Sequence, residues 1–149
     1  MLKKVSLAMI FIIILFLIFL QNQKKISQDY IVVKIIDGDT FKLSDGREIR
    51  LLGIDAPEQG QFYYDEAKNF LESLILGSKV VLEQDVTNRD KFGRYLRYVF
   101  VENNFVNLEL VKKGYARVVI RIPDTKYIDI LMQAESQARK NKLGIWSKY

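Results

Sequence analysis

The sequence predicts a domain of mainly β structure with added helices, an α+β fold built on a five-stranded OB-fold barrel with about three helices. Two observations predict this fold. Five short runs rich in β-branched and aromatic residues are separated by residues that favour turns. Stretches with apolar residues at helical spacing follow the third run and recur toward the C-terminus. Five strands with a helix after the third is the element order of an OB-fold barrel, a fold that commonly binds oligonucleotides.

The expected strands are bounded by turn signals. Asp and Gly at positions 37–38, and Ser-Asp-Gly at 44–46, separate the first three runs, so these three should form a meander. Pro57 stops the third run. The expected strands span residues 30–36, 40–43, 48–54, 79–83 and 94–102.

Three stretches carry apolar residues three and four positions apart, the spacing of a helix face. The first, residues 62–76, should end at Gly77. The second should be capped by Asn104 and end at Gly114. The remaining expected elements are a brief extended piece at residues 117–120 and a last helix that begins at Pro123-Asp124 and ends at Gly144.

Length and composition allow one domain with a real core, since the chain has 149 residues, of which 49% are apolar and 28% charged. The formal net charge of +5 arises mostly from residues 1–27, which hold four lysines and no acidic residue. Residues 28–149 carry 19 basic and 18 acidic groups, so bulk charge gives no argument for nucleic-acid binding. The chain has no cysteine and no histidine, which excludes disulfides, thiolate metal sites and imidazole or thiol catalysis.

The N-terminus resembles an export signal, because Lys3 and Lys4 precede an apolar run over residues 5–20. Two interpretations stay open. A cleaved signal peptide usually ends in small residues, and residues 21–25 contain none. A retained membrane anchor needs roughly 17–25 residues, and this run is slightly short.

Two domains follow from this pattern. Residues 1–27 are expected to be a signal peptide or signal anchor plus a linker, and residues 28–149 the catalytic domain. The domain should be exported and lie outside the cytoplasm, either secreted or anchored to the membrane through residues 5–20.

The candidate metal ligands are acidic residues at strand ends. Asp39 begins the second expected strand and Asp55 ends the third, and such ends meet in antiparallel neighbours. Glu58, beyond the Pro57 turn, can reach the same place. Carboxylates this close repel one another unless a cation neutralises them, and oxygen ligands suit Ca²⁺ or Mg²⁺ better than Zn²⁺. Asp37 beside Gly38 is explained more simply as a turn residue.

Two arginines complete the candidate site. Arg50 is the polar residue of an apolar segment, and by itself a solvent-facing position explains it best. Arg94 follows Gly93 in a polar loop, where a surface charge is an equal explanation. Near a carboxylate-bound metal, however, the two guanidinium groups would clamp a phosphate. The set as a whole indicates phosphodiester hydrolysis.

Three motifs in order carry a family resemblance: Asp-Gly-Asp-Thr at 37–40, Arg-Leu-Leu-Gly-Ile-Asp-Ala-Pro-Glu at 50–58, and Asp-Lys-Phe-Gly-Arg at 90–94. With these motifs the chain resembles the thermonuclease family, the staphylococcal-nuclease-like domains. The likeness covers roughly residues 30–148 and includes Leu-Gly-Ile-Trp-Ser at 143–147.

The resemblance implies a metal site and a cofactor. Asp39, Asp55 and the backbone carbonyl of Ala56 would bind one Ca²⁺ ion, with Asp37 placed behind these ligands. The family often has threonine where this chain has Ala56, and a carbonyl ligand tolerates that change.

The resemblance also implies a reaction, the cleavage of DNA and RNA by an endonuclease of low sequence specificity that leaves 3′-phosphorylated ends. Glu58 would act as general base on the attacking water or would orient it. Arg50 and Arg94 would bind the scissile phosphate and stabilise the five-coordinate transition state.

Expected substrate contacts depart from the best-known form of the family. Phe92 replaces a tyrosine after Lys91, and Ile120 and Ile122 stand where tyrosines stack on the base. Apolar contact would replace stacking with a loss of base affinity. Lys91, Phe92, Ile120 and Ile122 remain the expected substrate-binding residues, while the preference between DNA and RNA, or between single and double strands, stays open.

Two other functions are compatible with part of the pattern. A catalytically inactive OB-fold module could bind nucleic acid or protein, but such a site should have lost some of its catalytic residues. A secreted structural barrel could bind Ca²⁺ for stability, which leaves two arginines unexplained. The chain retains Asp39, Arg50, Asp55, Glu58 and Arg94, so a nuclease, expected to be a monomer, is the favoured interpretation.

Overall fold

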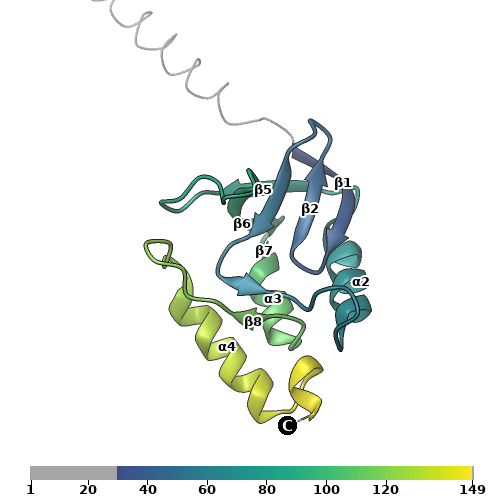
Figure 1. The fold of residues 1–149 in the computed structure, drawn as a ribbon, viewed down its shortest axis with the longest axis vertical. Coiled ribbons are helices and arrows are strands. Elements are labelled where there is room, and N and C mark those ends of the chain that lie inside the picture. The colour runs from purple at the N-terminus through teal and green to yellow at the C-terminus, as the bar shows by residue number, and fades with distance from the viewer. Residues whose placement is uncertain (1–29, 149) are drawn as a thin grey trace, which may run out of the picture.

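A computed structural model describes residues 30–148 and shows a barrel with helices packed at one end (Figure 1). The barrel strands are β1 (Tyr30–Asp37), β2 (Thr40–Leu43), β3 (Glu48–Leu51), β5 (Lys79–Glu83) and β6 (Tyr95–Val101). Neighbours follow the order β3-β2-β1-β5-β6, and a pairing of β3 with β6 closes the ring. That closing pair is parallel and the others are antiparallel. The predicted five-stranded barrel is therefore confirmed.

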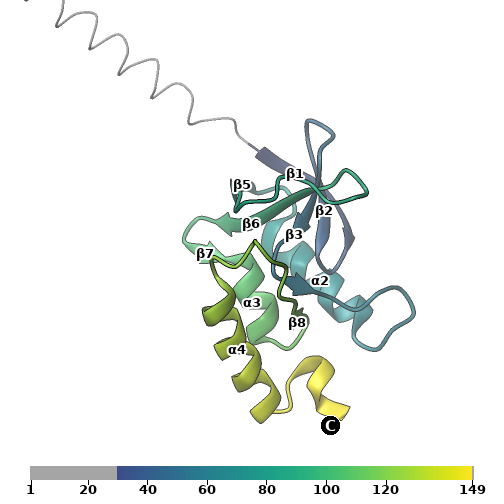
Figure 2. The ribbon, with the colours of Figure 1, turned by 60° about the vertical axis from the view of Figure 1, so that its left-hand side comes forward.

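The remaining elements extend the barrel and cover its lower end. They are β4 (Ile54–Asp55), α2 (Tyr64–Ile75), β7 (Asn104–Phe105), α3 (Val106–Lys112), β8 (Arg117–Val118), α4 (Ile128–Lys140) and a 3₁₀ turn, η1 (Gly144–Lys148). The short β4 pairs with β8, and β7 pairs with β6. In both ribbon views α3 lies between the barrel and α4 (Figures 1 and 2). The three α-helices agree with the predicted fold class.

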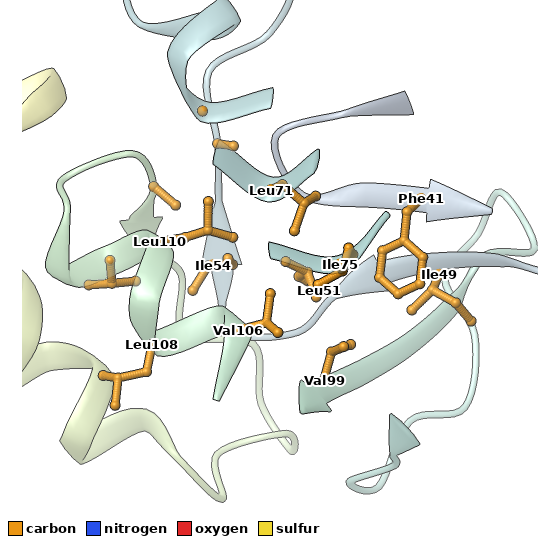
Figure 3. Packing of buried hydrophobic residues seen from close by; sticks show 14 of the residues in the cluster. Phe41, Ile49, Leu51, Ile54, Leu71, Ile75, Val99, Val106, Leu108 and Leu110 are labelled. Carbon is orange, nitrogen blue, oxygen red and sulfur yellow. The ribbon is translucent and has the colours of Figure 1, made fainter. Parts of the chain in front are cut away.

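The core fills the barrel and the space between barrel and helices (Figure 3). Ile49 and Leu51, two positions apart on β3, both point inward, as strand alternation requires. Burial of each such side chain stabilises the fold by about 1.5–3 kcal/mol. Other buried members are Phe41, Ile54, Leu71, Ile75, Val99, Val106 and Leu110.

The third strand ends earlier than the sequence indicated. A continuous strand was expected over residues 48–54, but β3 ends at Leu51 and the chain turns before β4. Gly53 causes the break, because its φ of 77° lies in the left-handed region that glycine adopts without strain. The turn lets Ile54 and Asp55 pair with β8 instead of continuing beside β6.

The last helix begins later than expected, at Ile128 and not at Pro123-Asp124. Asp124 is buried, and its carboxylate accepts hydrogen bonds from the backbone N–H groups of Val86 and Thr87, at 2.9 and 2.7 Å. This side chain therefore anchors a distant loop instead of capping the helix.

Within residues 30–148, no helix is long and apolar enough to cross a membrane. The expected signal peptide or anchor in residues 1–27 lies outside the described residues.

Asn107 joins α3 to the barrel from a fully buried position. Its amide Nδ2 donates to the carbonyl of Leu52 at 2.9 Å, and its Oδ1 accepts from the N–H of Val99 at 3.0 Å. One side chain thus satisfies two buried backbone groups and fixes the turn between β3 and β4.

We expect Asn107→Ala to lower the free energy of unfolding by about 2–4 kcal/mol, because it leaves two buried backbone groups without partners. Urea denaturation measures this change. Asn69→Ala, at an exposed position of α2, is the matched control and should shift stability by less than about 1 kcal/mol. Equal effects of the two substitutions would contradict the bridging role.

Candidate active site

Arg50 lies at the centre of the site and is buried, with 8% of its surface exposed. On β3, Arg50 pairs with Thr40 of β2 on one side and with Leu96 of β6 on the other. The alternative of a solvent-facing side chain is wrong, because the turn from β3 to β4 covers the guanidinium. That turn supplies two acceptors, the carbonyls of Leu51 at 2.8 Å and Ile54 at 2.9 Å from Nη1.

The other terminal nitrogen of Arg50 joins two carboxylates, one from the β1–β2 turn and one from β4. Its Nη2 lies 3.0 Å from Oδ2 of Asp39 and 2.9 Å from Oδ1 of Asp55. The structure therefore brings together these three predicted site residues. Removal of one partner from a buried pair of this kind typically destabilises a protein by about 3–5 kcal/mol.

Asp39 is held by further hydrogen bonds. Its Oδ2 accepts from the N–H of Ala56 at 2.7 Å, and its Oδ1 accepts from the hydroxyl of Thr40 at 3.0 Å. Burial raises the pKa of Asp39 to about 7, with Arg50 opposing the rise and Asp37 adding to it. Because burial disfavours the charged form, a cation at this position would favour ionisation of the carboxyl group.

Gly38 permits the close packing that places these groups. A Cβ at this position would lie 2.7 Å from the Cβ of Ala56 and 2.9 Å from that of Ala67 on α2. Only glycine therefore lets the β1–β2 turn approach so near to Ala56 and to α2. Asp37, at the same turn, accepts a hydrogen bond from the backbone N–H of Asp39 at 3.1 Å, and its expected place behind the metal ligands stays a prediction.

Arg50, Asp39 and Asp55 form an arginine–carboxylate cluster. Arg94 connects to this cluster through Thr40. Its Nη1 makes a long hydrogen bond of 3.5 Å with the Thr40 hydroxyl, which in turn donates to Asp39. Thr40 belongs to the first of the three motifs, but no role was predicted for it. The feature of the sequence that could have indicated a role for Thr40 is its hydroxyl group. A hydroxyl donates and accepts hydrogen bonds at once, so it can link a cation to a carboxylate.

Asp90 is a second residue whose role was not predicted from the sequence. Its Oδ2 accepts from Nε of Arg94 at 2.8 Å and lies 2.8 Å from Nη2, a two-point contact with the guanidinium. Its Oδ1 accepts from the backbone N–H groups of Phe92 and Arg94, at 2.9 and 3.0 Å. Asp90 therefore fixes both the loop and the direction of the Arg94 side chain. An acid four residues before an arginine, with glycine between, is the signal that could have shown it.

Glu58 stands apart from the cluster. It follows Pro57 with an exposed side chain, and its backbone N–H donates to the side chain of Gln61 at 2.8 Å. In the described part of the chain its carboxylate makes no hydrogen bond or ion pair with Arg50 or Asp39. The side chain can therefore turn toward solvent or substrate.

The expected substrate contacts all lie at the surface. Lys91 is exposed, with its Nζ 5.0 Å from the centre of the Phe92 ring, and Phe92 itself is 72% exposed. Ile120 and Ile122, on the segment after β8, are 58% and 84% exposed. Large apolar side chains left in solvent can contact a base, and for these residues that role stays a prediction.

The donors present suit a hard cation with few protein ligands. Across residues 30–148, no three acidic, histidine or cysteine side chains gather closely enough to hold a metal ion. Asp39 and Asp55 nevertheless converge on one nitrogen of Arg50, so two carboxylate groups lie together. The side chain of Asp55 is 44% exposed, which leaves room for water or phosphate oxygens beside it.

Comparison with known proteins gives a consistent result. The family described as staphylococcal nuclease homologue matches residues 48–148. A thermonuclease of Staphylococcus intermedius is 36% identical over 130 residues, which cover 81% of this chain and 77% of that protein. A thermonuclease of Staphylococcus hyicus is 38% identical over 129 residues, covering 80% and 76%. Endonuclease YncB of Bacillus subtilis is 39% identical over 139 residues, covering 86% of this chain and 65% of that protein.

The barrel, the arginine–carboxylate cluster and these relatives together define an OB-fold nuclease, a hydrolase of phosphodiester bonds. Within that class, the chain belongs to the staphylococcal nuclease family. The family resemblance that the three motifs predicted is thereby confirmed.

The contact between Asp90 and Arg94 predicts a pH-dependent effect. Burial acts to raise the pKa of Asp90, but hydrogen bonds from Arg94 and from the backbone of Phe92 outweigh it and lower the pKa. A lowered pKa in the folded state contributes stability that is present above the ordinary value of 3.8 and is lost as the pH falls through the folded-state value.

We therefore expect Asp90→Asn to lower the free energy of unfolding by about 1–3 kcal/mol at neutral pH, and by much less in acid well below the ordinary pKa. Urea denaturation of both proteins at the two pH values measures the difference. A destabilisation of the same size in acid and at neutral pH would show that the charge of Asp90 is unimportant.

Proposed function

We propose that this nuclease is a Ca²⁺-dependent endonuclease that hydrolyses DNA and RNA with low sequence specificity and leaves 3′-phosphorylated ends. The observation that carries the proposal is the Arg50 guanidinium placed between the carboxylates of Asp39 and Asp55. Oxygen ligands favour Ca²⁺ or Mg²⁺, and the family resemblance favours Ca²⁺. The relatives named thermonuclease and endonuclease support nucleic acid as substrate.

In this proposal Asp39, Asp55 and the backbone carbonyl of Ala56 would hold one Ca²⁺ ion. The ion would supply positive charge to the phosphate and lower the pKa of bound water. The two carboxylates share the charge of Arg50, so the protein itself provides a neutralising group beside both of them.

The arginines bind the scissile phosphate in the proposed reaction. Arg94 is positioned by Asp90, and Arg50 by the backbone carbonyls of the β3–β4 turn. Guanidinium groups bind phosphate oxygens in a two-point geometry and stabilise the charge that develops in the transition state. Contacts to phosphate carry no sequence information, which agrees with low sequence specificity.

Glu58 is the proposed general base. It takes a proton from the attacking water, or orients that water, while the water oxygen bonds to phosphorus and the P–O5′ bond breaks. The phosphate stays on the 3′ oxygen, and the leaving 5′ oxygen takes a proton from solvent. The exposed position of Glu58, two residues after the Ala56 that donates to Asp39, suits a group that must meet water and substrate. General base catalysis contributes roughly 10²–10⁴-fold, so the charged groups must supply the larger share of the acceleration.

Export of the domain is part of the proposal. Two lysines followed by the apolar run over residues 5–20 support secretion or attachment to the membrane, with the nuclease domain outside the cytoplasm. The proposal also takes the domain to act as a monomer.

The test is digestion of single-stranded DNA and of RNA with Ca²⁺ or with a calcium chelator. We expect Glu58→Gln to lower turnover by about 10²-fold or more while nucleic-acid binding stays close to that of the wild type, because the substitution removes only the base. Glu72→Gln, at an exposed position of α2, is the matched control with full activity. Mass spectrometry of the ends should show 3′-phosphate.

The proposal fails if the wild type digests neither substrate with Ca²⁺ present, or if the chelator leaves its rate unchanged. Turnover of Glu58→Gln at the rate of Glu72→Gln would remove Glu58 from the mechanism.

A further inference from the structure

Three arginines surround one tyrosine ring beside the loop that carries Asp90 and Arg94, here called the catalytic loop. The guanidinium carbon of Arg89 lies 4.0 Å from the centre of the Tyr95 ring, that of Arg97 lies 5.1 Å away and that of Arg47 lies 5.6 Å away. We call these four residues the arginine–tyrosine cluster. Cations at these distances are attracted to the face of an aromatic ring.

The fold gathers the cluster from three segments. Arg47 precedes β3 in the β2–β3 hairpin, Arg89 lies in the connection to β6, and Arg97 follows Tyr95 on β6 by two positions. Residues two apart share a face of a strand, so Tyr95 and Arg97 lie on the same side. A backbone bridge between Arg89 and Tyr95 brings the connection against this side. The structure thus builds the cluster from fixed backbone positions.

The positive charge of the cluster is only partly neutralised. Arg47 pairs with Asp45, whose Oδ2 accepts from its Nε at 2.7 Å. Among the described contacts, however, Arg89 donates to the hydroxyl of Tyr95 and makes no ion pair with a carboxylate.

Arg97 likewise makes its described hydrogen bonds with neutral groups, at 2.7 Å to the side chain of Asn88 and 2.7 Å to the carbonyl of Leu96. Burial lowers the pKa of Arg97; Tyr95 opposes this shift, and the positive charges of Arg47 and Arg89 add to it. An anion beside the cluster would relieve this repulsion.

A cavity joins the cluster to Arg94, one of the two arginines of the proposed active site. It has a volume of about 420 Å³, and both Arg89 of the cluster and Arg94 of the catalytic loop line it. Phe92, largely exposed, forms part of the same wall. Two acidic residues, Asp45 and Glu48, also line it, the first of them paired with Arg47. A chain of phosphates that reaches Arg94 can therefore continue past Arg89 without leaving the cavity.

We propose that the arginine–tyrosine cluster is a second phosphate subsite, which binds a phosphodiester of the same nucleic-acid strand next to the one held by Arg94. This inference rests on the proposed function. Arg89, which is exposed, contacts the strand, while Tyr95 holds its guanidinium and Arg97 holds the neighbouring Asn88. Arg47, paired with Asp45 and stacked on Tyr30, adds positive charge beside the subsite. The cation–aromatic contacts occupy the Tyr95 ring, so the subsite recognises backbone phosphate and not a stacked base.

The test compares Arg89→Ala with the wild-type full chain on two substrates, a longer single strand and a dinucleotide that has one phosphodiester. We expect kcat/KM on the longer strand to fall by at least about fivefold more than kcat/KM on the dinucleotide, because only the longer strand reaches the subsite. Binding of the longer strand is followed by fluorescence anisotropy with chelator present, so that the strand stays intact. The logarithmic slope of affinity against salt should become shallower by about 0.7 for each phosphate that is no longer neutralised.

Asp45→Asn gives a result of opposite sign. Asparagine can keep the hairpin hydrogen bond to the N–H of Arg47, which is 3.1 Å long, but it removes the negative charge from the cavity. We expect tighter binding of the longer strand in this variant. Lys140→Ala, at the exposed last residue of α4, one of the helices packed at the lower end of the barrel (Figures 1 and 2), removes one positive charge elsewhere and should match the wild type.

Equal reductions of kcat/KM by Arg89→Ala on both substrates, or an effect no larger than that of Lys140→Ala, would overturn the subsite. Weaker binding by Asp45→Asn would do the same. A wild type that binds the longer strand yet digests neither substrate would contradict the proposed function and leave the binding comparison as a valid test of the subsite.

Discussion

The guanidinium of Arg50 holds the two sides of the site together. It bonds to carboxylates from the β1–β2 turn and from β4, and to two carbonyls of the turn between β3 and β4. A buried cation of this kind is stable only when its donors have partners, and a buried carboxylate such as Asp39 needs a counter-charge. The ion pairs therefore serve the fold and the proposed chemistry at once, since the groups that would bind metal and phosphate also join the β1–β2 turn to β4.

The barrel sets the positions of these groups with little freedom. β3 has a partner strand on each side, so the backbone of Arg50 is fixed by the ladder. Gly38 allows the β1–β2 turn to approach Ala56, which donates to Asp39. The loop that carries Arg94 is held by Asp90. Preorganisation of this kind lets charged groups act on a transition state without first rearranging.

Most of the fold could be predicted from the sequence because the strand signals are local. β-Branched runs between glycine and aspartate turns indicated the five barrel strands, and three ordered motifs indicated the family. Prediction failed where contacts between distant segments decide the exposure of a side chain or the end of a strand. Alternation indicated a solvent-facing Arg50, since the turn that covers it cannot be seen in the strand pattern. A run of apolar residues concealed the break at Gly53. The arginine–tyrosine cluster was missed because its members come from three segments that only closure of the barrel brings together.

The central claim is that Asp39 and Asp55, joined by Arg50, form the site of one divalent cation. Thermal unfolding of the full chain against Ca²⁺ concentration tests it most directly and needs no substrate. A ligand that binds only the folded state at 100 times its Kd stabilises it by about 2.7 kcal/mol, so Tm should rise with Ca²⁺ in the wild type. The rise should persist in Asp129→Asn, an exposed control on α4, and disappear in Asp39→Asn. A wild-type Tm that does not change with Ca²⁺ concentration would contradict the account. A rise in Asp39→Asn equal to that of the wild type would contradict it as well.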